Sequence, residues 1–80
     1  MLISSIIVKT RSGRAETVLS ELQKIPRVTT YGIHRGNSII LVAETHDVPQ
    51  LEHLLDFIRE HFEDVLSVSP TYMNFEEDTA

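Results

Sequence analysis

The stretch that most constrains the fold is residues 38–44, Ser-Ile-Ile-Leu-Val-Ala-Glu. Its length, its β-branched and aliphatic residues and the turn-forming residues on both sides predict a β-strand. Successive side chains of a strand point to opposite faces of its sheet, so a strand with one solvated face normally alternates apolar and polar residues. Residues 39–43 are all apolar, and polarity returns only at Glu44. The pattern predicts a central strand with something against each face.

Further strands and helices are predicted around this stretch. Strands are expected at 3–9, at 28–34, and from 65 to 69, the last ending near Pro70 or continuing to 73. Pro70 requires an edge position or a bulge. One helix is expected to run to about Lys24, with Ser12 or Gly13 as its cap. A second is expected from Asp47, where Gln50 completes a capping box, to Phe62.

The order strand, helix, strand, strand, helix, strand predicts an α+β fold, the ferredoxin-like βαββαβ sandwich. In it, a four-stranded antiparallel sheet carries both helices on one face, and the first and third strands form the central pair. Residues 35–37 are expected to form a hairpin turn, in which Gly36 and Asn37 are able to take positive φ. Residues 1–80 are expected to form a single domain with an acidic tail, frayed from about residue 74.

Charge and composition exclude several classes of partner. The formal net charge is -5 at pH 7, and an acidic chain lacks the basic face that nucleic-acid binding requires. No apolar stretch is long enough to cross a membrane, and no basic segment precedes the apolar N-terminal run, so neither membrane insertion nor export is expected. The chain contains no cysteine, which permits a cytoplasmic location.

Catalytic, cofactor and metal sites are not predicted. His53 and His61 are separated by about 12 Å of helical rise, too far to share one ion, while His34 and His46 lie at opposite ends of one strand. The serines lie in no nucleophile motif, and residues 35–38 lack the glycines and lysine of a phosphate loop. A domain of this size has little depth for a walled pocket. We therefore predict a non-enzyme.

The sheet face that the helices leave free is the predicted binding site. Strict alternation along the first, third and fourth strands places nine residues on this face: Ile3, Ser5, Ile7, Lys9, Ile40, Val42, Glu44, Ser67 and Ser69. The four aliphatic side chains among them could expose a few hundred Å2, an area typical of interaction sites. A homodimer that stacks sheets face to face, or a cover formed by the chain's own tail, would also explain such a patch.

Several segments resemble one protein family. Residues 3–8, Ile25-Pro26 with Val28, the run 37–47, and 65–69 followed by Tyr72 resemble the NapD family, the small cytoplasmic assembly chaperones of periplasmic nitrate reductase. The resemblance spans nearly the whole chain. Two turns depart from the family pattern, because Arg27 and Glu63-Asp64 stand where glycine is common.

The resemblance implies a partner and a mode of binding. Such chaperones hold the twin-arginine signal peptide of the nitrate reductase catalytic subunit and delay its export until the molybdenum cofactor and the iron–sulfur cluster are in place. The peptide is expected to lie as a helix on the free sheet face, with Glu44 and the acidic tail attracting its arginines. The chain itself would carry no cofactor and would be a monomer or a weak homodimer.

Two other functions fit the same topology. A small-molecule-sensing regulatory domain would dimerise through its sheet and would carry a glycine-rich effector loop, which the sequence lacks. A purely structural homodimer would bury the same apolar face against a second copy.

Overall fold

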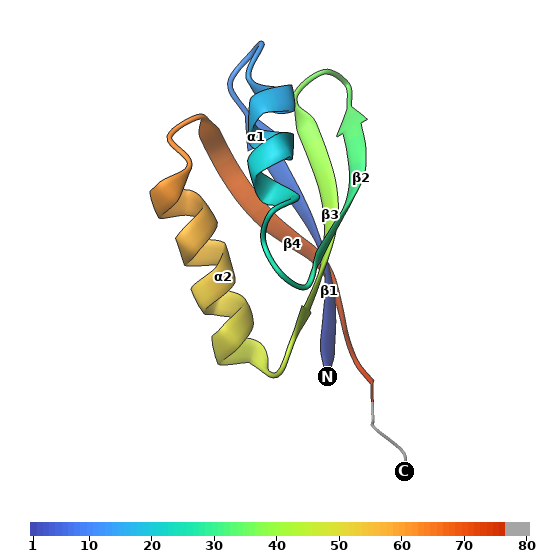
Figure 1. Ribbon diagram of the computed structural model, residues 1–80. Coiled ribbons are helices and arrows are strands. Elements are labelled where there is room, and N and C mark those ends of the chain that lie inside the picture. The colour runs from blue at the N-terminus through green and yellow to red at the C-terminus, as the bar shows by residue number, and fades with distance from the viewer. Residues whose placement is uncertain (77–80) are drawn as a thin grey trace.

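A computed structural model describes residues 1–76 and contains four strands and two helices (Figure 1). In chain order they are β1 (Leu2–Thr10), α1 (Ala15–Leu22), β2 (Val28–His34), β3 (Ser38–Thr45), α2 (Val48–His61) and β4 (Val65–Phe75). This order confirms the predicted ferredoxin-like sandwich.

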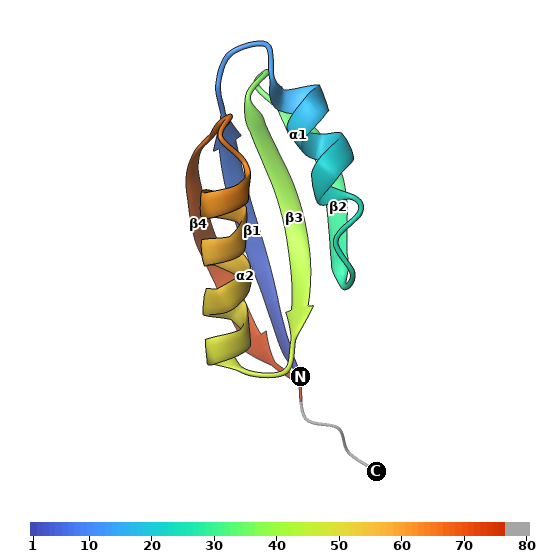
Figure 2. The same ribbon diagram turned by 60° about the vertical axis from the view of Figure 1, so that its left-hand side comes forward.

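The sheet has the strand order β2-β3-β1-β4, and every neighbouring pair is antiparallel. The two strands richest in aliphatic residues, β1 and β3, therefore form the central pair, as predicted. Both helices lie over the same face, α2 in front of β1 and β4 and α1 beside β2 and β3 (Figures 1 and 2). The opposite face has no helix over it in the described part of the chain.

The core lies between the sheet and the helices. It takes alternate residues from β1 and β3 and the apolar stripe of each helix, namely Leu2, Ile6, Val8, Ile39, Leu41, Ala43, Val18, Leu22, Leu51, Leu55 and Ile58, with Val68 from β4. The period of two along the strands and of three or four along the helices produces this arrangement. Three polar residues are also buried, Ser4, Thr10 and Thr45, and the Ser4 hydroxyl has no hydrogen-bond partner among the described residues.

The beginning of α2 follows the prediction. The Asp47 carboxylate accepts a hydrogen bond from the Gln50 N–H at 2.9 Å, which satisfies a backbone donor that the first helical turn leaves free. The Gln50 side-chain oxygen accepts a hydrogen bond from the N–H of His46, one residue before the cap. These two hydrogen bonds hold the start of α2 against the end of β3.

The beginning of α1 differs from the prediction. Neither Ser12 nor Gly13 caps the helix: the cap position is Arg14, which makes no side-chain capping bond, and the helix ends at Leu22. Gly13 has a φ of 79°, a left-handed conformation that turns the chain before the helix begins. The Arg14 side chain instead donates to the Asp64 carboxylate at 3.0 Å, so the acidic turn before β4 secures the loop before α1.

The turn between β2 and β3 also differs in detail. Arg35 and Gly36 have positive φ, whereas Asn37 does not. The Asn37 carbonyl accepts the N–H of Thr10 at 2.9 Å, so Asn37 bonds to the end of β1 directly before β3 begins at Ser38.

β4 extends further along the chain than the apolar stretch from which it was predicted. Pro70 lies on the edge strand and next to a register shift, which meets both conditions that its missing N–H imposes. Asn74 and Phe75, where fraying was expected to begin, pair with Ile3 and Leu2. The remainder of the predicted tail, 77–80, lies outside the described residues.

Arg27 has a backbone conformation that favours glycine, since its φ is 66°. Its carbonyl accepts the Glu44 N–H at 2.9 Å, which fixes this conformation at the start of β2. A left-handed residue with a Cβ costs about 1–2 kcal/mol. We expect Arg27→Gly to raise the free energy of unfolding by about 0.5–1 kcal/mol, measured by urea denaturation. Arg27→Ala, which keeps the Cβ, should give no gain; an equal gain would show that the side chain, and not the backbone, is responsible.

Candidate functional site: the open sheet face

The open face is the side of the sheet opposite both helices, and the strand registers decide which residues share it. In β1 and β3, Ile7 is paired with Ile40, Ser5 with Val42 and Ile3 with Glu44. Directly opposed residues point to the same face, and the residues between them are the buried ones of the core. The parity predicted for both central strands is therefore correct.

The edge strand β4 adds its serines to the same face. Ser69 is opposite Ile7, and Ser67 is opposite Lys9. All nine residues predicted for the site thus lie on one face and form one continuous surface across three strands.

The central aliphatic side chains are less exposed than the sequence suggested. Ile3, Ile7, Ile40 and Val42 are half-buried, because neighbouring side chains on a pleated surface shield one another. They form an apolar row along the middle of the open face, on the two central strands.

One tyrosine that was not predicted for the site borders this row, and a second stands on the opposite edge strand. Tyr31 lies in the irregular part of β2 opposite β3, and Tyr72 is opposite Ser5; their side chains are 60% and 62% exposed. Each stands on an edge strand, and the pairing of Tyr72 with Ser5 places Tyr72 on the open face beside the aliphatic row. Tyrosine offers a large apolar ring with a polar tip, a combination enriched at interfaces.

Charge is divided between the two ends of the open face. Glu44 is exposed at the end where Met1 and Glu76 lie, and Lys9 is exposed at the other end, next to the β2–β3 turn. At the Glu44 end the Met1 ammonium donates to the Glu76 carbonyl at 3.0 Å, which brings the Glu76 segment alongside. An elongated ligand would therefore meet opposite charges at its two ends.

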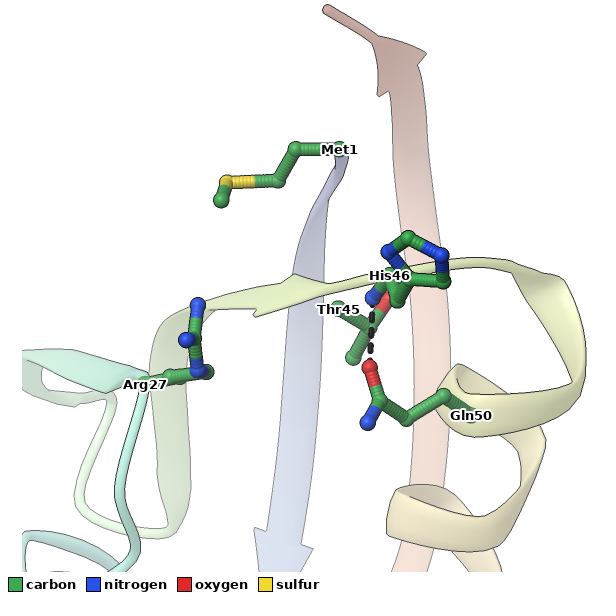
Figure 3. A pocket seen from close by; sticks show the side chains of 5 residues that line it. All are labelled: Met1, Arg27, Thr45, His46 and Gln50. Carbon is green, nitrogen blue, oxygen red and sulfur yellow. Dashed lines mark hydrogen bonds between the residues drawn. The ribbon is translucent and has the colours of Figure 1, made fainter.

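A polar cavity lies beyond this end of the sheet. Met1, Arg27, Thr45, His46 and Gln50 line a space of about 260 Å3 (Figure 3). Its walls are hydrogen-bonding groups apart from Met1, so it lacks the apolar lining typical of ligand pockets.

Side chains that could bind a metal ion do not cluster in the described part of the chain. Among residues 1–76, no three histidine, aspartate or glutamate side chains are close enough to hold an ion. No helix within those residues has the length and apolarity to cross a membrane.

Comparison with known proteins identifies relatives of the whole chain. The solution structure of the E. coli Tat proofreading chaperone NapD superposes with a TM-score of 0.77 at 25% identity, covering 98% of this chain and 82% of that one. The crystal structure of hypothetical protein PHS023 from Pyrococcus horikoshii superposes with a TM-score of 0.81 at 19% identity, covering 98% and 94%, which supports the fold alone. A search of curated proteins found no match.

The family model gives the assignment. The model of the NapD protein family matches residues 1–77, and therefore includes both central strands and the edge strand that build the open face. The chain belongs to the NapD family, whose general role is that of a chaperone in nitrate reductase maturation.

Proposed function

We propose that this chain binds the twin-arginine signal peptide of the periplasmic nitrate reductase catalytic subunit on its open face, in the cytoplasm, and delays export until the cofactors are inserted. The observation that carries the proposal is the aliphatic row on the open face, bordered by Tyr72, in a chain of the NapD family. The E. coli relative, described as a Tat proofreading chaperone, supports the same partner.

The dimensions of the face suit a helical peptide. From Ile3 to Lys9 a strand advances six residues, or about 20 Å. A helix of that length contains about 13 residues, within the 7–15 residues of the apolar region of a signal peptide. The aliphatic row would bury one stripe of such a helix, and Tyr72 would stand beside it.

The charges give the bound peptide a direction. A signal peptide carries its positive charge before its apolar region, so its arginines would lie at the Glu44 end. The carbonyl end of the peptide helix would then approach Lys9, where a cation is favourable. The direction follows from two exposed charges at opposite ends of the face.

The role of Glu44 is testable by calorimetric titration with a synthetic twin-arginine peptide. A partly desolvated ion pair at an interface is worth about 1 kcal/mol, so Glu44→Gln should raise Kd about fivefold at low salt and flatten the salt dependence. Lys9→Gln, with the opposite charge change at the other end, should weaken binding equally whether or not the peptide keeps its arginines, because Lys9 faces the carbonyl end of the peptide helix. With a peptide whose two arginines are replaced by glutamine, the effect of Glu44→Gln should vanish; an equal effect with both peptides would exclude the pairing.

A further inference from the structure

The outer edge of β4 changes character at Pro70. Val65–Phe75 contains no charged residue, although charge is the usual protection of an exposed edge. Before Pro70, the Arg59 guanidinium on α2 donates to the Val68 carbonyl at 3.0 Å, and the proline itself interrupts pairing. After Pro70, the stretch 71–75 has neither a basic side chain nor a proline on its edge.

Hydrogen bonding at the chain ends shows which groups of this stretch face outward. Met1 and Glu76 exchange bonds in both directions, at 3.0 and 2.8 Å. In an antiparallel ladder such bonded pairs alternate with pairs that exchange none. By this alternation, Asn74 and Ile3 form the next bonded pair. The pairs on either side of it, Phe75 with Leu2 and Met73 with Ser4, exchange no backbone hydrogen bonds. The N–H and C=O groups of Phe75 and Met73 therefore point away from β1.

The same two residues also present apolar side chains. Met73 and Phe75 are opposite Ser4 and Leu2, so they lie on the helix side of the sheet, yet they are 52% and 61% exposed and do not belong to the core. The free backbone edge and the exposed side chains belong to one short segment. The other edge strand, β2, is interrupted by a register shift between Thr30 and Ile33.

We infer that β4 is a homodimerisation edge, at which 73–75 pairs antiparallel with the same segment of a second copy. The outward N–H and C=O groups are self-complementary. A two-fold axis at Asn74 places Met73 of each copy opposite Phe75 of the other copy. Each of these pairs can exchange both hydrogen bonds. On the helix side, each methionine then lies against a phenylalanine, a favourable sulfur–aromatic contact. An uncharged strand permits this approach of two like-charged chains.

The pairing leaves the proposed peptide site free. A two-fold axis perpendicular to the sheet joins the two sheets edge to edge, so both open faces lie on the same side and neither is covered. This distinguishes the arrangement from a dimer that stacks open faces. The inference does not depend on the proposed function, because it uses the edge of β4 and not the face.

Sedimentation velocity over a wide concentration range tests the inference. The wild type should move from monomer to dimer as concentration rises, whereas Met73→Pro should remain monomeric at every concentration. Proline at this position removes an N–H that makes no bond to β1, so the fold should persist by circular dichroism. Phe75→Lys, which adds a charge to the edge and leaves the backbone intact, should also remain monomeric. Val42→Glu should dimerise like the wild type.

Four results would overturn the inference. In sedimentation, these are a wild type that stays monomeric at every concentration, a dimer retained in both edge variants, and a dimer lost in Val42→Glu. The fourth is a hydrogen-exchange result in which the backbone amides on the edge of β4 become protected only when peptide is added. Peptide titration of Met73→Pro separates the two proposals, because binding on the open face should be unchanged in that variant.

Discussion

Replacing Ile7 or Val42 with glutamate is expected to abolish measurable binding of the twin-arginine peptide while the chain stays folded. Both side chains are half-buried in the middle of the open face, where a bound helix would remove a new carboxylate from water without giving it a partner. An uncompensated buried charge costs about 3 kcal/mol or more, which corresponds to a loss on the order of 100-fold in affinity. Calorimetric titration measures the loss directly.

The matched control is Val48→Glu. Val48 begins α2 on the other side of the sheet and is 37% exposed, so this variant makes the same chemical change away from the open face. An acid in the first helical turn is also favourable to the helix. The control should bind like the wild type. If both open-face variants bound the peptide as the control does, the open face could not be the binding site.

Leu41→Ala is expected to cost about 2–5 kcal/mol of folding free energy. Leu41 is fully buried on the central strand β3, inside the core between the sheet and the helices. Its truncation therefore leaves a cavity that the sheet and the helix layer cannot close. A chain of 80 residues has a total stability of about 4–12 kcal/mol. The variant should therefore be close to unfolding at 25 °C, as measured by urea denaturation.

The neighbouring residue gives the comparison. Val42→Ala changes the same strand on its other face, where the side chain is only half-buried, and should cost about 1 kcal/mol or less. It should weaken peptide binding more than it weakens the fold. Equal destabilisation by the two truncations would mean that both faces of β3 are packed alike, contrary to the one-sided helix layer.

Much of the fold could be predicted because two strands carry an unambiguous pattern. The first and third strands are aliphatic on both faces, and the polar residues Lys9 and Glu44 at their ends fix which alternate set faces the helices. The capping box at Asp47 likewise rests on a local interaction between residues three apart. Where the determinant is local or strictly periodic, the sequence is sufficient.

The parts that could not be predicted lie next to irregular backbone. Register shifts between Thr30 and Ile33 and opposite Ser5 break simple alternation, so the side chains of Tyr31 and Tyr72 could not be assigned to a face by counting. A glycine in β2 and a proline in β4 signal bulges but not their registers. The cap of α1 was missed because Arg14 pairs with Asp64, fifty residues away, a contact that no local pattern encodes.

The most direct test of the account is to follow the backbone amide signals of the isotope-labelled chain by nuclear magnetic resonance during titration with the twin-arginine peptide. The largest shifts should fall on β1 and β3, at Ile7, Ile40 and Val42, and at the flanking Tyr72, while the outer surfaces of α1 and α2 remain unchanged. Shifts concentrated on the two helices, with the open face unperturbed, would contradict it.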